Sequence, residues 1–187
     1  MLRSLLVMLL ALAIACGGRG EKPAPGTAKP VAQAAAPAES KPVDVGSQMP
    51  AYAAQYLDGK TFDIKDQRGK VVFLNLWATW CGPCRFEIPE LQKLHDSYAA
   101  RGFAVVGVSV DEGDIKVVRD FVAEQKMTYP VVQDSAGSLA VLLDTSILPT
   151  SLILDRSGRV VWKKLGMVTS ADAEMVRVIE KALAQEG

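Results

Sequence analysis

Hydrophobic residues along this chain follow two alternating patterns, which predict strands and helices in turn. Two continuous apolar runs, residues 71–77 and 103–110, are typical of strands that are buried on both faces. Apolar side chains recur at helical spacing over residues 81–98, 114–126 and 171–185. The pattern therefore predicts three helices and two central strands.

Shorter elements complete the pattern, and two of the predicted strands flank the turn dipeptide Asp58-Gly59 as an N-terminal hairpin. A second hairpin is predicted around the turn at residues 155–158. The short predicted elements are strands 52–55, 61–64, 129–133, 151–154 and 160–164, and a helix over 138–143. This order implies an α/β fold with a central mixed sheet, parallel at its core, covered by helices and extended by the N-terminal hairpin.

The first fifteen residues are typical of an export signal. A positive start at Arg3 precedes an apolar stretch over residues 5–14, which is too short to span a bilayer comfortably. Residues 13–16, Ala-Ile-Ala-Cys, resemble the bacterial lipobox, in which the cysteine, here Cys16, becomes the lipidated first residue. Ordinary cleavage that leaves Cys16 free and an uncleaved weak anchor are the alternatives. All three predict an extracytoplasmic domain, either a membrane-anchored lipoprotein on the periplasmic side or a soluble periplasmic protein.

Composition divides the rest of the chain into a tether and one domain. Residues 16–45 are rich in Ala, Pro, Gly, Lys and Glu and have almost no large apolar side chains, so they are predicted to be a flexible tether. The chain has 187 residues and is 49% hydrophobic, which is ample for a single core in a domain over residues 46–187.

Charge gives no sign of a nucleic-acid partner. Lys and Arg total 21, Asp and Glu total 21, and no basic stripe stands out. Asp111, Glu112 and Asp114 form an acidic loop, which we interpret as solvated and as a helix cap. Protein thiols are the expected substrates.

Two cysteines carry the candidate chemistry. Cys81 and Cys84 stand in Trp-Cys-Gly-Pro-Cys directly after a predicted central strand, where a helix begins. A thiol in the first helical turn faces unpaired backbone N–H groups and the positive end of the helix dipole, which stabilise thiolate over thiol. Cys81 is therefore the predicted nucleophile of a redox pair.

Other uses of this cysteine pair are less well supported by the residues around it. Structural zinc usually needs four ligands, but the chain has only one further cysteine, Cys16, and one histidine, His95. Covalent haem attachment needs His straight after the second cysteine, where Arg85 stands. A static disulfide with a two-residue spacer would constrain little chain entropy. Reversible redox exchange is the favoured interpretation, with no metal.

The stretch from Lys70 to Pro89 is similar to the active-site stretch of extracytoplasmic thioredoxin-like proteins of the TlpA and ResA type. The resemblance spans about residues 46–185 and includes Leu148-Pro149-Thr150, where that family has its cis-proline loop. It implies a thioredoxin fold and reversible dithiol exchange, which often serves cytochrome c maturation or general disulfide reduction outside the cytoplasm.

The predicted proton carrier is Glu87. Ordinary thioredoxins have a buried Asp six residues before the first cysteine, but this chain has Asn75 there, and an amide cannot accept a proton at ordinary pH. Glu87 lies three residues after Cys84 on the same predicted helix, so the two side chains are neighbours. If burial raises its pKa, Glu87 can shuttle a proton to and from Cys84; the alternative is a solvated helix residue.

The predicted substrate-binding residues flank the two thiols. Pro83 fixes the approach of the two sulfurs within the first helical turn, and Trp80 belongs to the docking rim. The family resemblance implies a cis bond before Pro149, which would place the backbone of Leu148 beside Cys81, open to an extended substrate segment. The full set is Trp80, Gly82, Pro83, Leu148 and Pro149, whereas Trp77 is expected in the core.

The sequence thus predicts a protein-disulfide reductase. The thiolate of Cys81 attacks a substrate disulfide, and Cys84 resolves the mixed disulfide. No flavin or nicotinamide motif is present, so no cofactor beyond the redox pair is expected, and a membrane thiol-disulfide donor would recharge the protein. Two alternatives remain: a peroxiredoxin-like peroxidase, disfavoured because Ala78 occupies the place of its threonine, and a non-enzymatic copper-delivery or chaperone module.

Overall fold

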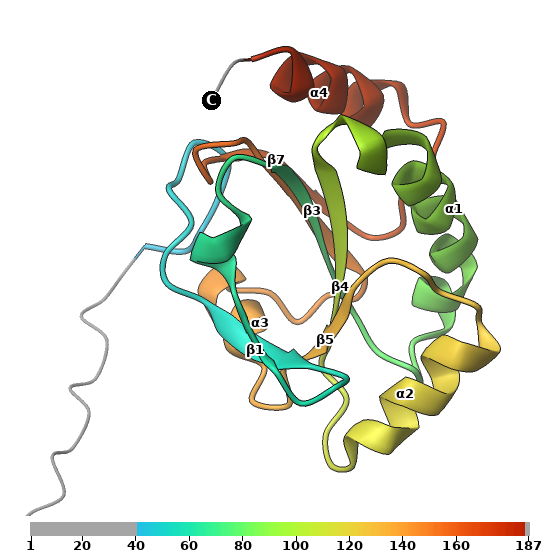
Figure 1. The fold of residues 1–187 in the computed structure, drawn as a ribbon. Helices are drawn as coiled ribbons and strands as arrows, with labels where there is room; N and C mark the ends of the chain where they lie inside the picture. Colours follow the sequence, from blue (N-terminus) through green and yellow to red (C-terminus); the bar gives the residue numbers. More distant parts are fainter. Residues whose placement is uncertain (1–40, 186–187) are drawn as a thin grey trace, which may run out of the picture. The chain divides into compact units, whose positions relative to one another are not determined.

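The computed structural model describes residues 41–185, which form a seven-stranded sheet with helices on both faces (Figure 1). Its elements are, in chain order, β1 (Ala53–Tyr56), β2 (Thr61–Asp63), η1 (Ile64–Gln67), β3 (Val71–Trp77), α1 (Gly82–Tyr98), η2 (Ala99–Arg101), β4 (Phe103–Ser109), α2 (Ile115–Glu124), β5 (Val131–Gln133), α3 (Ser138–Leu143), β6 (Thr150–Leu154), β7 (Val160–Leu165) and α4 (Ala173–Ala184). Every predicted helix and strand is present, with bounds within a few residues.

The sheet is mixed, as the sequence predicted. The strand order is β2-β1-β5-β4-β3-β6-β7, in which β3, β4 and β5 are parallel. β1 pairs antiparallel with β5 and β6 with β3, and the edge strands β2 and β7 pair antiparallel with β1 and β6. The N-terminal hairpin of β1 and β2 extends one edge of the sheet through its pairing with β5. This arrangement confirms the predicted thioredoxin-like architecture with an N-terminal hairpin.

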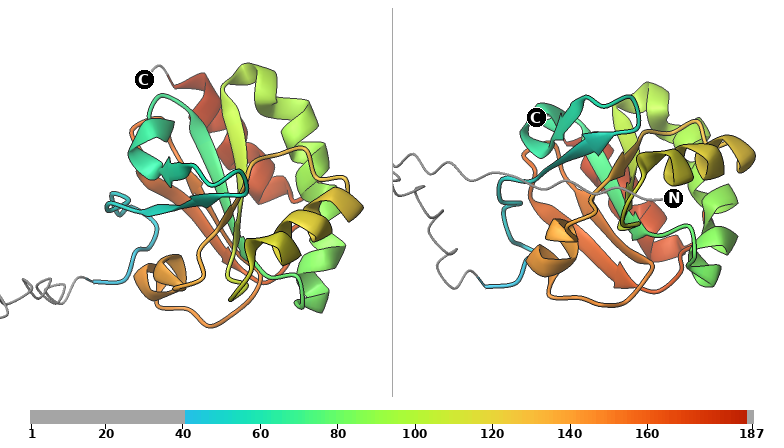
Figure 2. Two further views of the ribbon diagram at one scale, coloured as in Figure 1. Left: turned by 60° about the horizontal axis from the view of Figure 1, so that its bottom comes forward. Right: turned by 90° about the horizontal axis from the view of Figure 1, so that it is seen from below.

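Two cores lie on the two faces of the sheet, with α1, α2 and α4 on one face and α3 on the other (Figures 1 and 2). All seven residues of β3 are buried, which explains its continuous apolar run. Phe73 and Trp77 pack into the core with α1, whereas Leu74 and Leu76 pack with α3. The polar Asn75 is buried in this central strand, so its amide needs hydrogen-bond partners.

The domain begins earlier than the predicted boundary at residue 46. Val43 is only 5% exposed, its amide donates to the carbonyl of Leu142, and its own carbonyl accepts from Lys163. Residues 43–45, predicted as the end of the tether, are thus part of the folded unit because one buried valine and backbone pairing hold them. The export signal, Cys16 and the rest of the tether lie outside the described residues.

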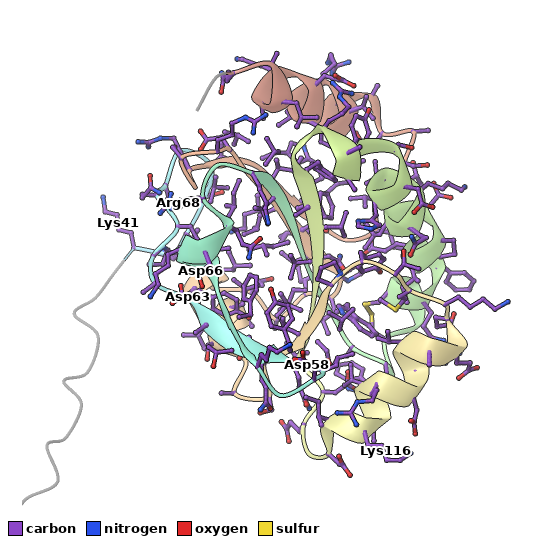
Figure 3. All side chains as sticks on the ribbon, viewed as in Figure 1. Lys41, Asp58, Asp63, Asp66, Arg68 and Lys116 are labelled. Carbon is purple, nitrogen blue, oxygen red and sulfur yellow. A yellow bond between two sulfur atoms is a disulfide. The ribbon has the colours of Figure 1, made fainter. Side chains whose placement is uncertain are left out.

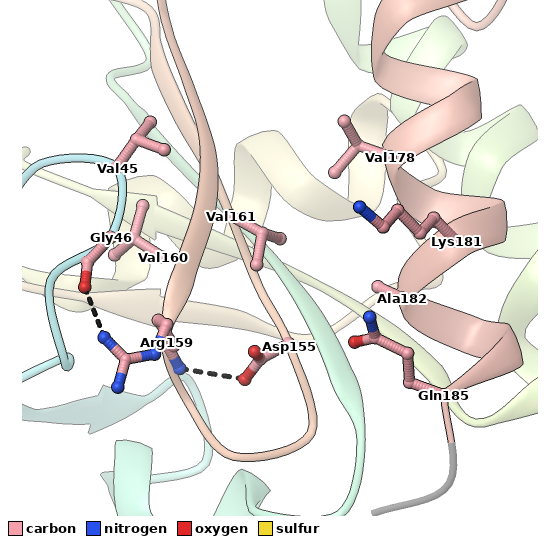
Figure 4. A pocket seen from close by; sticks show the side chains of 10 residues that line it. All are labelled: Val45, Gly46, Asp155, Arg159, Val160, Val161, Val178, Lys181, Ala182 and Gln185. Carbon is pink, nitrogen blue, oxygen red and sulfur yellow. Dashed lines mark hydrogen bonds between the residues drawn. The ribbon is translucent and has the colours of Figure 1, made fainter.

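The segment that contains Gly46 packs against β7 at the edge of the sheet. The amide of Gly46 donates to the carbonyl of Val160, and the Arg159 guanidinium donates to the carbonyl of Gly46. A hollow of about 340 Å³ lies between this segment, β7 and α4 (Figure 4). Neither cysteine of the redox pair lines it. Over residues 41–185, the helices are too short or too polar to cross a membrane.

Candidate active site

Cys81 and Cys84 form a disulfide where β3 leads through residues 78–81 into α1 (Figure 3). Cys81 is the N-cap of α1, and its Sγ accepts a hydrogen bond of 3.2 Å from the backbone amide of Cys84. Pro83 stands in the first turn, where a missing N–H costs nothing. Cys81 is 5% exposed and Cys84 only 1%, so Cys81 is the sulfur closer to solvent.

A buried carboxylate fixes the loop that carries the first cysteine. Asp111, at the end of β4, accepts from the backbone amide of Thr79 at 2.9 Å and from the Thr79 hydroxyl, and also from the hydroxyl of Ser109 at 2.6 Å. The interpretation of Asp111 as part of a solvated loop is therefore wrong: it is 5% exposed because these donors satisfy it. Asp114, by contrast, caps α2, as predicted.

The sheet register brings the proline loop to the same edge. Leu76 pairs with Thr150, so the C-terminal end of β3 and the start of β6 lie side by side. The peptide bond between Leu148 and Pro149 is cis, in agreement with the family resemblance, and the Pro149 carbonyl accepts from the amide of Gly166. Among the described residues, the backbone N–H and C=O of Leu148 have no hydrogen-bond partner.

Glu87 lies in the core behind the disulfide rather than in solvent. The side chain is on the buried face of α1 together with Cys84, and the residue is 1% exposed. Its two carboxylate oxygens accept from the Asn75 amide and, at 2.9 Å, from the backbone amide of Val168. Burial raises the pKa of Glu87 to about 7, against the opposing effect of these two hydrogen bonds and the charge of Lys164. The alternative of a solvated helix residue is therefore excluded.

Sequence reasoning missed the partners of Glu87. Asn75, considered only as a group unable to accept a proton, donates to Glu87 and to the Ser151 hydroxyl on β6. Burial, and after it the charge of Glu87, raise the pKa of Tyr129. A single polar residue inside a continuous apolar strand was the available signal for Asn75.

A second glutamate, one turn further along α1, binds the loop that carries Val168, but does so at the surface of the domain. Glu90 accepts from the backbone amide of Ser170 at 2.9 Å and from its hydroxyl, and it pairs with Lys93. The carboxylates of Glu87 and Glu90 thus hold the loop between β7 and α4 against α1.

Two large apolar side chains are exposed near the start of α1. Trp80 is 70% exposed and Phe86 is 76% exposed, whereas Trp77 is buried against Phe121, as predicted. Trp80 and Leu148 together line a hollow of about 290 Å³. The structure thus gathers Trp80, Leu148 and Pro149 around the start of α1, where Cys81, Gly82, Pro83 and Cys84 follow one another.

Comparison with known proteins gives the family. The model of the AhpC/TSA family matches residues 45–163, which is more than half of the chain. The chain belongs to the AhpC/TSA family. Within this family it is similar to the thiol-disulfide oxidoreductase ResA of Bacillus cereus, with 34% identity over 73% of this chain and 79% of the relative.

Solved structures place this AhpC/TSA member among thioredoxin-like proteins. A thiol:disulfide interchange protein of the thioredoxin family from Chlorobium tepidum TLS has a TM-score of 0.64 and 31% identity, over 79% of this chain and all of that one. A secreted thiol-disulfide isomerase from Corynebacterium glutamicum has a TM-score of 0.66 and 31% identity, over 74% of this chain and 86% of that one. The chain is a thiol-disulfide oxidoreductase with the thioredoxin fold.

The buried Glu87 predicts a pH-dependent stability of the oxidised protein. Its pKa is about 7 in the folded chain, against an ordinary value of 4.5. Between pH 4.5 and pH 7, Glu87 is therefore protonated in the folded state and ionised in the unfolded state. The contribution of Glu87 to the free energy of unfolding is therefore complete below about pH 4.5 and is lost as the pH rises through about 7. The expected loss is about 3 kcal/mol.

Urea unfolding of the parent and of Glu87→Gln at pH 5 and pH 8 measures this contribution. Other carboxylates titrate equally in both proteins, so the difference between the two isolates Glu87. The parent should lose more stability than the variant between these pH values. An equal loss in both proteins would contradict the raised pKa.

Proposed function

We propose that this chain reduces protein disulfides outside the cytoplasm, with Cys81 as nucleophile and Cys84 as resolving thiol. The observation that carries the proposal is the disulfide at the start of α1, where the amide of Cys84 donates to the Sγ of Cys81. The same amide and the helix dipole would stabilise a thiolate on Cys81 once the disulfide opens. The greater exposure of Cys81 supports the same assignment.

The reaction takes two exchange steps. The Cys81 thiolate attacks one sulfur of the substrate disulfide, which forms a mixed disulfide and releases the other sulfur as a thiolate. Cys84 then loses its proton to the Glu87 carboxylate and attacks Cys81 Sγ, which breaks the mixed disulfide and closes the bond between Cys81 and Cys84. The substrate gains two electrons and the enzyme loses two.

Glu87 suits the second step because its pKa of about 7 lies near the operating pH. At that pH both protonation states are populated, so the carboxyl accepts the Cys84 proton and gives one back when the enzyme is reduced. Asn75 and the amide of Val168 hold the carboxyl in place and act as positioning groups.

Substrate binding is assigned to the residues around the disulfide. The free backbone N–H and C=O of Leu148, next to the cis bond to Pro149, can pair with an extended substrate segment. Gly82 faces open space, since a side chain there would meet no other part of the domain within 4 Å, and Pro83 completes this low surface. Trp80 provides an apolar rim.

The proposal also covers where the protein acts and which partners it has. The N-terminal export signal supports an extracytoplasmic site, and the similarity to a secreted isomerase agrees with it. Lipidation of Cys16 would anchor the domain to the membrane. A membrane thiol-disulfide donor would return two electrons to the pair, and no other cofactor is needed. The resemblance to the TlpA and ResA type supports cytochrome c maturation or general disulfide reduction as the setting.

The peroxidase alternative is disfavoured by the loop before Cys81. Ala78 occupies the place of the peroxidase threonine, and the hydroxyl of the adjacent Thr79 donates to Asp111. A copper-delivery module would bind Cu(I) through the same two thiolates, Cys81 and Cys84, so the comparison with thiol-disulfide oxidoreductases is what favours reduction. Reduction of protein disulfides remains the better supported function.

Insulin reduction with dithiothreitol as electron source tests the proposal. The parent should accelerate insulin precipitation well above the rate with dithiothreitol alone, and the Cys81→Ser/Cys84→Ser double variant should not. A Cu(I) titration of the reduced parent is run beside it. Tight Cu(I) binding without insulin reduction would overturn the proposal in favour of metal delivery.

A further inference from the structure

The carboxylate of Asp111 lies behind the loop that leads into the redox pair. It accepts from the backbone amide of Thr79 at 2.9 Å, from the Thr79 hydroxyl, and from the Ser109 hydroxyl at 2.6 Å. The backbone carbonyl of Asp111 accepts from the side-chain amide of Gln133 at 2.8 Å, which fixes the residue from the other side. Within residues 41–185, Asp111 forms no salt bridge. Its buried negative charge is therefore satisfied by neutral donors.

This charge lies close to the first cysteine. Thr79 stands two residues before Cys81, and because consecutive Cα atoms are about 3.8 Å apart, the Cα atoms of the two residues lie within about 8 Å. The loop is also a tight turn, since the amide of Cys81 donates to the carbonyl of Ala78 at 3.1 Å. Asp111 and Cys81 are each only 5% exposed, so little water screens the charge from the sulfur.

A negative charge at this position acts against the start of α1. The helix N-terminus stabilises a thiolate on Cys81, whereas the carboxylate of Asp111 repels it. The thiolate belongs to the reduced form of the pair, while the disulfide carries no charge, so the repulsion raises the free energy of the reduced form alone. A dithiol whose reduced form is less stable gives up its two electrons more readily, and the protein becomes a stronger reductant.

The other charged groups around the pair do not supply the same repulsion. They are Arg85 and Glu87 on α1, Glu112 after β4, and Lys164 on β7. Arg85 and Glu112 are exposed to water, as are the charged residues of α2. Lys164 pairs with a carboxylate of its own, and the carboxyl of Glu87 is held by Asn75 beside the second cysteine. Asp111 is thus the buried charge nearest to the loop before the first cysteine.

We propose that Asp111 is a positioning residue that makes this chain a stronger reductant, because its buried charge disfavours the thiolate of Cys81. This inference rests on the proposed function and gives a structural reason for its direction. The carboxylate and the sulfur are separated by a distance on the order of 10 Å, and at an effective permittivity of about 20 the repulsion changes the redox equilibrium by about 10-fold.

Asp111→Asn tests the proposal because it removes the charge and can keep the contacts. An amide oxygen still accepts from Thr79, and the Ser109 hydroxyl can accept from the new N–H group. The protein is equilibrated at pH 7 with mixtures of reduced and oxidised glutathione, in which two glutathione thiols give two electrons to the disulfide. Mass spectrometry after alkylation measures the reduced fraction. The variant should become half reduced at a ratio of squared reduced to oxidised glutathione about 10-fold lower than the parent.

The rate of alkylation of Cys81 by iodoacetamide gives a second measurement, because the thiolate is the form that reacts. The pH at which this rate is half-maximal should fall by about one pH unit in Asp111→Asn. Asp111→Ser removes the same charge with a smaller side chain and should shift both measurements in the same direction. Urea unfolding identifies which of these two variants is folded under the assay conditions.

Two further variants separate the charge from other effects. Glu112→Gln removes the neighbouring carboxylate, which water screens, so the glutathione equilibrium should change by less than about 2-fold. Thr79→Val removes one hydrogen bond of the loop but keeps the charge of Asp111, so it should retain the parent equilibrium. An equal shift in Glu112→Gln, an equal shift in Thr79→Val, or an unchanged equilibrium in Asp111→Asn would each overturn the proposal.

Failure of this inference and failure of the proposed function give different results. If the parent reduces insulin and equilibrates with glutathione, but removal of the Asp111 charge does not move the equilibrium, only the role of Asp111 is wrong. If the parent neither reduces insulin nor exchanges with glutathione, the proposed function fails.

Discussion

Replacing Cys84 with Ser is expected to stop turnover while leaving the first half of the reaction intact. The Cys81 thiolate keeps its position at the start of α1 and still attacks a substrate disulfide, but no second thiol is present to release the product. Because an intramolecular thiol acts at a very high effective concentration, its loss should slow turnover by about 10³-fold or more. The enzyme should accumulate as a mixed disulfide, which non-reducing electrophoresis and mass spectrometry detect.

Cys81→Ser is the matched comparison. It should lose turnover equally but trap nothing, since the remaining thiol of Cys84 is only 1% exposed and lies behind the first cysteine. Purification of Cys84→Ser from its host then identifies the bound substrates. Trapping by Cys81→Ser and not by Cys84→Ser would reverse the roles of the two cysteines.

Glu87→Gln is expected to slow the resolving step by about 10²-fold, which is the lower end of the usual effect of a general acid or base. The glutamine keeps the size of the side chain and can still accept from the Val168 amide, but it cannot take a proton from Cys84. Attack by Cys81 should be unchanged. Stopped-flow mixing with a peptide disulfide, followed by acid quench and mass spectrometry, measures the two steps separately.

Glu90→Gln is the control on the same helix. Glu90 lies one turn further along α1 and binds the same loop through Ser170, but its pKa is lowered to about 2, chiefly by Lys93 and Ser170, so it stays ionised at neutral pH. This variant should resolve the mixed disulfide at the parent rate. A resolving rate and pH profile in Glu87→Gln equal to those of Glu90→Gln would show that Glu87 is only structural.

The hydrophobic pattern of the sequence was sufficient to predict β3 and α1, the two elements on either side of the redox pair. The apolar run of β3 has the predicted bounds, Val71–Trp77, and α1 begins one residue after the predicted start at Cys81. Both follow from short-range physics, because continuous burial produces an apolar run and the helix N-terminus is marked by Pro83. The cis bond before Pro149 required the family resemblance, since sequence alone favours trans.

The environment of Glu87 could not be predicted in the same way. Helical spacing placed it beside Cys84, but its burial depends on contacts with other elements: Asn75 on β3 and Val168 in the loop after β7. These contacts come from the order of strands in the sheet, which periodicity does not encode. For the same reason Asp111 was misread, because a run of acidic residues signals solvent unless the donors around Thr79 are already known.

Every proposed step depends on Cys81 and Cys84 forming a reactive dithiol at neutral pH, with Cys81 ionised at the start of α1. The direct measurement is the reaction of the reduced protein with oxidised glutathione at pH 7, followed by the mass of the product. We expect rapid loss of two hydrogens, with the glutathionylated protein appearing only transiently. A reduced protein that stays unchanged toward glutathione across neutral pH, while remaining folded, would contradict it.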